Sequence, residues 1–183
     1  LSNTDKVVHH EYHKYYEPVL KPYYNSRGSI VEIGLGTTAS LPMWHNIFKH
    51  AHIYGVDIED TYFVNDRCTI YKADQGNVDD LNRLTYLLTD KNVFFINDDG
   101  SHIPEHQLLT FNTLFPILVE GGYYIIEDIE TSYWIKGECY NYKTRYGYKN
   151  STSIIEIFKD SIDIVNSEFI YDKNILSNKI FHH

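Results

Sequence analysis

The segment "FFINDDGSH", residues 94–102, places two acids and an imidazole directly after an apolar run. A buried strand needs neither Asp98 nor Asp99 at its end, and His102 follows three residues after the second acid, beyond a glycine. Carboxylates can hold a cation, and a nearby imidazole with a reference pKa of about 6.5 can move a proton near neutral pH. These residue types at this spacing therefore indicate a metal ion beside a general base.

Short apolar runs that alternate with helical patterns must position these residues. The predicted strands cover 29–33, a run ending near Asp57, 68–74, 92–97 and 121–128. The predicted helices cover 40–50, 77–88, 105–118 and 151–169, with Asn77 capping the second and Ser151 or Thr152 the last. This alternation is typical of a mostly parallel sheet covered by helices on both faces.

Acidic residues gather where these predicted strands end. In open sheets of this kind, ligands bind at the carboxyl ends of the strands. Packing alone does not explain why five strands deliver acids to that edge. The acids in question are Glu32, Asp57, Asp74, Asp98, Asp99, Glu127 and Asp128.

The loop "VEIGLGTTAS", residues 31–40, bears on the cofactor. Gly34 and Gly36 allow a tight turn and a close approach to a ligand, and Asp57 is placed to accept hydrogen bonds from a ribose. A dinucleotide fingerprint needs a third glycine where Thr37–Thr38 stand, which disfavours a nicotinamide cofactor. Glu32 before the first glycine suits the cationic S-adenosylmethionine (SAM) better. A simple strand-to-helix turn remains the alternative.

Three carboxylates at neighbouring strand ends favour a hard cation. Asp99 and the Glu127–Asp128 pair offer oxygen ligands, which suit Mg²⁺, Mn²⁺ or Ca²⁺ better than Zn²⁺. Without a cation the acids would repel one another. Spacing alone does not decide between Asp98 and Asp99 as the ligand.

Composition narrows the class of protein. The 183 residues, 43% of them hydrophobic, suffice for one domain with a real core. The net charge of −9 and the lack of a Lys/Arg cluster argue against nucleic-acid binding, and no run of 18 apolar residues suggests a membrane span. Two cysteines without a disulfide or metal spacing favour a cytoplasmic location.

Two longer strings carry a family resemblance. "DDGSH" at 98–102 and "IEDIETSYW" at 126–134, together with the glycine loop, resemble the class I SAM-dependent methyltransferases. Within that fold the chain looks most like the metal-dependent sugar O-methyltransferases of the macrocin and mycinamicin type. The likeness covers about residues 3–135 and, more loosely, the helix at 151–169.

The resemblance implies a role for each matching residue. Glu32, Gly34 and Gly36 would surround the methionine part of SAM, and Asp57 would hold the ribose hydroxyls. The family also implies that Asp74 and Gln75 lie near the adenine and that His102 is the general base. Its ligands for Mg²⁺ (or Mn²⁺ or Ca²⁺) would be Asp99, Glu127 and Asp128. With Asp99 as the ligand, Asp98 would contact SAM or cap the following turn.

The expected protein is thus a single Rossmann-like domain over residues 1–183, acting on a sugar, a glycoconjugate or another vicinal diol. We expect residues 1–27 to form a lid or packing segment and 134–153 a loop on the acceptor side. The sequence stops where the family continues into a last strand or hairpin, so we expect that element to be truncated. A homo-oligomer, a non-catalytic SAM-fold accessory protein and, less favoured, an NAD-dependent oxidoreductase remain alternatives.

Overall fold

The computed structural model describes residues 4, 6, 11–137 and 144–169. The chain forms two compact units. The first comprises Leu1–Ser101 and His106–Glu127, and the second comprises His102–Glu105 and Asp128–His183. Each unit is described by itself below.

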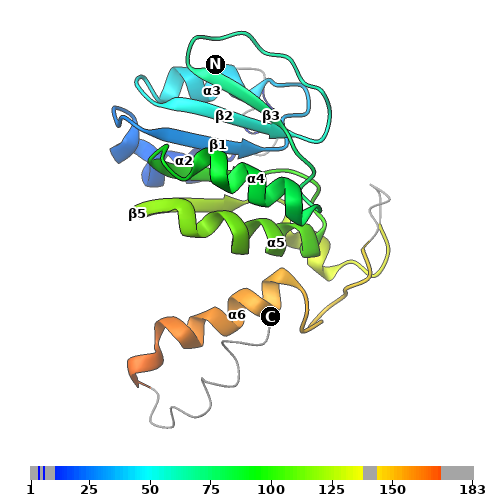
Figure 1. Ribbon diagram of the computed structural model, residues 1–183. Coiled ribbons are helices and arrows are strands. Elements are labelled where there is room, and N and C mark those ends of the chain that lie inside the picture. Colours follow the sequence, from blue (N-terminus) through cyan, green and yellow to red (C-terminus); the bar gives the residue numbers. More distant parts are fainter. Residues whose placement is uncertain (1–3, 5, 7–10, 138–143, 170–183) are drawn as a thin grey trace. The chain divides into compact units, whose positions relative to one another are not determined.

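The first unit is built on a five-stranded sheet with the order β3-β2-β1-β4-β5 (Figure 1). Every neighbouring pair is parallel, which confirms the predicted sheet. Because parallel strands point the same way, the residues that follow them lie along one edge of the sheet. The strands are β1 (Ser29–Ile33), β2 (His52–Asp57), β3 (Cys68–Lys72), β4 (Val93–Asp98) and β5 (Leu118–Ile126).

Helices cover both faces of this sheet. Figure 1 shows α4 and α5 in front of the strands. Residues of α2 and α3 join a separate apolar cluster with the opposite face. The helices are α2 (His13–Leu20) with η1 (Lys21–Tyr23), α3 (Ser40–Ile47), α4 (Val78–Leu88), and α5 (Pro104–Leu114) with η2 (Phe115–Ile117).

Alternating side chains divide the core into two layers. Ile30, Ile53 and Phe95 pack with Trp44 and Phe48 on one face of the sheet. The neighbouring positions in the same strands contribute Val31, Tyr54 and Ile96 to the other face. Both faces of the sheet are therefore covered by apolar side chains, which explains why these strands are continuous apolar runs in the sequence.

The second unit contains η3 (Ile129–Tyr133), α6 (Ile154–Val165) and η5 (Ser167–Phe169). The side chain of Ser153 accepts a hydrogen bond from the backbone N–H of Glu156 and caps α6. The predicted cap at Ser151 or Thr152 is therefore wrong, and the helix is shorter than the predicted range 151–169.

Several expectations fall partly or wholly outside the described residues. The predicted N-terminal segment 1–27 and the loop 134–153 are each described only in part, and the predicted truncation concerns 170–183, which are not described. Among the helices that are described, none is long and apolar enough to cross a membrane.

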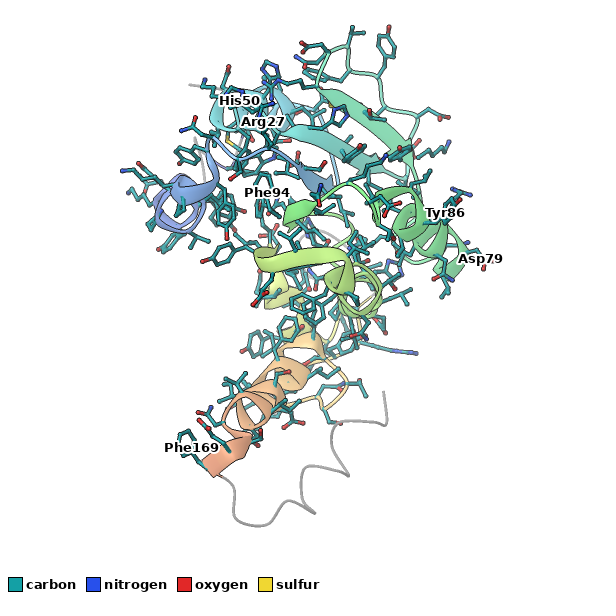
Figure 2. The ribbon with its side chains drawn as sticks, turned by 60° about the vertical axis from the view of Figure 1, so that its left-hand side comes forward. Arg27, His50, Asp79, Tyr86, Phe94 and Phe169 are labelled. Carbon is teal, nitrogen blue, oxygen red and sulfur yellow. The ribbon has the colours of Figure 1, made fainter. Side chains whose placement is uncertain are left out.

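Phe48 tests the aromatic core of the first unit. Its side chain is fully buried and contacts the rings of Tyr24, Trp44 and Phe94. Phe48→Ala should lower the free energy of unfolding by about 3–5 kcal/mol, measured by urea denaturation, because it leaves a cavity. Tyr86 projects outward from α4 and is 85% exposed (Figure 2), so Tyr86→Ala should change stability by no more than about 0.5 kcal/mol. Equal effects of the two substitutions would contradict this packing.

Candidate active site

In the first unit, a buried lysine lies close to three of the predicted acidic residues. The Lys6 Nζ donates hydrogen bonds to Asp99 Oδ2 and, at 2.7 Å, to Glu127 Oε1. It lies 3.8 Å from Glu32 Oε1. The Lys6 side chain is only 3% exposed, so these charges face one another with little water between them. The ends of β1, β4 and β5 thus converge on one ammonium group.

Polar side chains of the same unit complete this cluster. Glu127 Oε1 also accepts hydrogen bonds from the Tyr16 hydroxyl and, at 2.8 Å, from Asn97 Nδ2. Ser40 Oγ donates to Glu32 Oε2 at 2.6 Å. The residue pattern did not predict Lys6, Tyr16 or Asn97 as members of this cluster. Only Asn97 carried a local signal, as a polar residue at the end of an apolar strand.

Asp98 points away from this cluster, although it is adjacent to Asp99. Its Oδ1 accepts a hydrogen bond from Gln75 Nε2 at 2.5 Å, and its Oδ2 accepts one from the Tyr124 hydroxyl at 3.2 Å. Gln75 Oε1 in turn accepts from the backbone N–H of Ser101 at 2.8 Å. Asp98 therefore anchors the start of the "GSH" loop, and of the two acids it is Asp99 that joins Glu127.

Burial makes these acids hard to ionise. It raises the pKa of Asp99 to about 8, helped by the negative charge of Glu127 and opposed by Lys6. Burial also raises the pKa of Asp98 to about 7, against the hydrogen bonds from Gln75 and Tyr124. The pKa of Glu32 is raised by burial too, although Lys6 and Ser40 favour its charged form. A further cation near Asp99 and Glu127 would stabilise their ionised state.

Lys6 and Tyr16 both keep their protons in this setting. Burial alone would lower the pKa of Lys6, but the charges of Glu32, Glu127 and Asp99 outweigh it and raise that pKa. Burial, followed by the charge of Glu127, raises the pKa of the Tyr16 hydroxyl. Both groups therefore act as hydrogen-bond donors to the carboxylates at neutral pH.

The glycine loop between β1 and α3 is shaped by two different constraints. Gly34 has φ +84°, and a Cβ there would meet the carbonyl oxygen of Asp99 at 2.0 Å. Gly36 has φ +46°, and a Cβ at this residue would meet no atom of the described residues within 4 Å. The first glycine thus lets the β4–α5 loop approach, and the second leaves room beside the loop.

Asp57 is held beside that loop by backbone donors. Its Oδ2 accepts from the N–H of Leu35 at 2.8 Å, and its Oδ1 accepts from the N–H of Glu59 at 2.9 Å. The carboxylate is therefore fixed at the end of β2, where it was expected. Each of its oxygens keeps a second lone pair with which it can accept from a ligand hydroxyl.

Asp74 lies in the turn between β3 and α4. Its Oδ1 accepts from the backbone N–H of Gly76 at 2.8 Å, and its own N–H donates to Asp80 Oδ2 at 2.9 Å. Asn77 caps α4 by accepting from the N–H groups of Asp79 and Asp80, which confirms the predicted cap. These bonds give Asp74 a role in the turn, while its predicted role near adenine stays a prediction.

The remaining two predicted site residues belong to the second unit. His102 Nε2 lies 3.5 Å from Asp128 Oδ2. Both residues adopt left-handed backbone conformations, with φ values of +52° and +53°. Such conformations are unfavourable for residues other than glycine, and they are enriched at functional sites. The imidazole and the carboxylate are thus brought together at two locally strained positions.

The residues present at the site fit the metal ion and the cofactor that the sequence predicted. All the candidate metal ligands are carboxylates, whose hard oxygens suit Mg²⁺. Asp99 and Glu127 already share one positively charged partner, and burial, followed by the negative charge of Glu127, raises the pKa of Asp99. For SAM, the open space at Gly36 and the fixed carboxylate of Asp57 offer a surface for a cationic ligand with a ribose diol.

The sequence of the chain is similar to those of two known O-methyltransferases. No family model matches the chain. It is 37% identical over 139 residues to an 8-demethyl-8-alpha-L-rhamnosyl tetracenomycin-C 2'-O-methyltransferase of Streptomyces olivaceus, covering 72% of this chain and 36% of that protein. It is also 37% identical over 134 residues to a demethylmacrocin O-methyltransferase of Streptomyces fradiae, covering 68% of this chain and 33% of that protein.

Structural comparison agrees. The MycE methyltransferase from the mycinamycin biosynthetic pathway, in complex with Mg and SAH, matches with a TM-score of 0.74 and 29% identity. The match covers 87% of this chain and 42% of MycE. A second MycE structure, which also contains mycinamycin VI, matches with a TM-score of 0.71 and 30% identity over 84% of this chain and 42% of MycE.

The parallel sheet and its likeness to MycE define a class I SAM-dependent methyltransferase fold. By sequence, the chain is a homologue of the sugar O-methyltransferases of the macrocin, mycinamicin and tetracenomycin type. It spans only about a third of the length of the curated relatives named above.

The two loop glycines make a matched pair of tests. Gly34→Ala should lower the free energy of unfolding by about 3 kcal/mol or more, because the positive φ and the clash with the Asp99 carbonyl add together. Gly36→Ala should cost only about 1 kcal/mol, because it meets the same backbone penalty without a clash. Urea denaturation of both variants measures the difference, and equal losses would refute the close approach at Gly34.

Proposed function

We propose that this chain transfers the methyl group of SAM to a hydroxyl of a sugar or of another vicinal diol, with a divalent cation, most simply Mg²⁺. The homologues named above are sugar O-methyltransferases, and MycE was solved with Mg, SAH and mycinamycin VI. A glycosylated small molecule is therefore the class of acceptor that we propose.

One observation carries this proposal. The carboxylates of Asp99 and Glu127, from the ends of two neighbouring strands, converge on a single ammonium group in a buried setting. Two acids that share one cationic partner are already within reach of one further cation. A non-catalytic accessory protein or a nicotinamide enzyme would have no need for such a costly cluster at this edge of the sheet.

For SAM, the proposed contacts lie in the first unit. Asp57 accepts hydrogen bonds from the ribose hydroxyls, and Gly34 and Gly36 admit the methionine part close to the backbone. Glu32 faces the positive end of the cofactor, while Asp74 and Gln75 lie on the adenine side. Asp98 supports this region through the hydrogen bond that it accepts from Gln75.

For the reaction, we propose that Asp99, Glu127 and Asp128 hold the cation. When bound, such a cation makes the acceptor hydroxyl more acidic. His102 takes the hydroxyl proton on an imidazole nitrogen, and Asp128 stabilises the imidazolium. The acceptor oxygen then forms a bond to the methyl carbon as the bond from that carbon to sulfur breaks, which leaves a methyl ether and S-adenosylhomocysteine (SAH).

Four further assignments remain proposals. The loop 134–153, described in part, would contact the acceptor, and residues 1–27 would cover the cofactor side. Cys68 is a free thiol, in keeping with a cytoplasmic location. A homo-oligomer is compatible with the sequence.

Asp57 provides the test for the cofactor. Titration calorimetry of the chain with SAH should give a measurable Kd, and Asp57→Ala should weaken it about 10–100-fold, because charge-assisted hydrogen bonds to the ribose are lost. Asp60→Ala, which alters an exposed acid three residues away, should leave the Kd unchanged. A folded wild-type chain without affinity for SAH would refute the methyltransferase proposal.

Asp99 and its neighbour provide the test for the metal. Asp99→Asn should weaken Mn²⁺ binding by at least about 30-fold, since one charged ligand is lost. Asp98→Asn should stay within about threefold of the wild type, because that side chain bonds to Gln75 and Tyr124 instead. Electron paramagnetic resonance of free Mn²⁺ measures both values. The reverse order of effects would show that Asp98 is the ligand.

A further inference from the structure

The backbone of Glu127 is held in place by hydrogen bonds of both its N–H and its carbonyl group. It follows directly after β5, and its N–H donates to the carbonyl oxygen of Asp98 at 2.9 Å. Its own carbonyl oxygen accepts from Gln107 Nε2 at 3.1 Å. The main chain therefore leaves only the side-chain torsions to decide where the carboxylate points.

Those torsions are set by three hydrogen-bond donors, all of which bind the same oxygen of the carboxylate. Lys6 Nζ, Asn97 Nδ2 and the Tyr16 hydroxyl donate to Glu127 Oε1. Among the described residues, every hydrogen bond to this carboxylate goes to Oε1, and none goes to Oε2. Three donors saturate the first oxygen, so the second is the atom that keeps its lone pairs for a cation.

Tyr16 is the donor with the most rigid placement. Its ring is 7% exposed and packs against Trp44 and Phe95, with centroid distances of 5.7 and 6.4 Å. Its hydroxyl also lies 3.1 Å from Asn97 Oδ1, and its single proton can be donated to only one of these two acceptors at a time. The shorter of the two contacts is the one to Glu127 Oε1, so the hydroxyl holds the carboxylate directly.

We propose that Tyr16, together with Lys6 and Asn97, is a positioning residue that holds Glu127 Oε1 and thereby presents Oε2 to the divalent cation. This inference rests on the proposed function, since it takes Glu127 as a metal ligand. Outer hydrogen bonds of this kind commonly change metal affinity by about 10–100-fold. It assigns the helix α2 a role in metal binding from 111 residues away in sequence.

Tyr16→Phe isolates this role, because it removes one hydroxyl and changes neither the ring packing nor any charge. Mn²⁺ binding, followed by electron paramagnetic resonance, should weaken about tenfold relative to the wild type. Tyr23→Phe is the matched control. It removes a hydroxyl of the same N-terminal segment that bonds to the carbonyl oxygen of Gly121, outside the cluster, and should leave Mn²⁺ affinity unchanged.

Unfolding by urea in the presence of a chelator shows that each variant is folded and separates stability from affinity. Mn²⁺ binding by Tyr16→Phe within twofold of the wild type, or an equal loss in Tyr23→Phe, would overturn the inference while leaving the proposed function intact. A folded wild-type chain that binds no Mn²⁺ would instead remove the metal from the proposed function, and this inference with it.

Discussion

The buried ammonium of Lys6 is the interaction on which the arrangement of the first unit's acids depends. Three carboxylates, from Glu32, Asp99 and Glu127, lie around it; the side chains of Glu32 and Glu127 are almost fully buried, and that of Asp99 is 22% exposed. A buried charge without a partner costs several kcal/mol, and a lost partner is not replaced by solvent. Lys6 therefore joins the ends of three strands and is itself part of the candidate site.

The sheet that delivers these acids could be predicted from local sequence, because its central strands β1, β2 and β4 are buried and read as apolar runs. The predicted first strand, 29–33, coincides with β1. The fifth differs: β5 begins at Leu118, three residues before the predicted start. "GG" at 121–122 suggested a turn, whereas Gly121 takes φ +79° within the strand, where the pairing with β4 shifts register. Glycine allows both outcomes, and only the neighbouring strand decides between them.

The acidic residues of the candidate site could be predicted from the sequence, whereas the residues that form hydrogen bonds with them could not. Side chains alternate along β4, so Phe95 and Asn97 share one face while Ile96 and Asp98 share the other. If this alternation continues, Asp99 lies on the same face as Tyr16 and Lys6. Once the fold is known, the alternation therefore indicates Asp99, rather than Asp98, as the metal ligand. Lys6 and Tyr16 had no such signal, since they contact Glu127 across 121 and 111 residues, and no local pattern records a contact of that range.

Charge balance explains why the lysine and a metal ion need not exclude each other. Three carboxylates and one ammonium leave the cluster with two uncompensated negative charges when all are ionised. Burial, followed by the negative charge of Glu127, raises the pKa of Asp99 to about 8. A second monovalent partner would leave one charge buried, whereas a divalent cation would neutralise both. The two cations can coexist only if they use different oxygens. The hydrogen bonds of Glu127 meet this condition, because Lys6, Tyr16 and Asn97 all occupy Oε1.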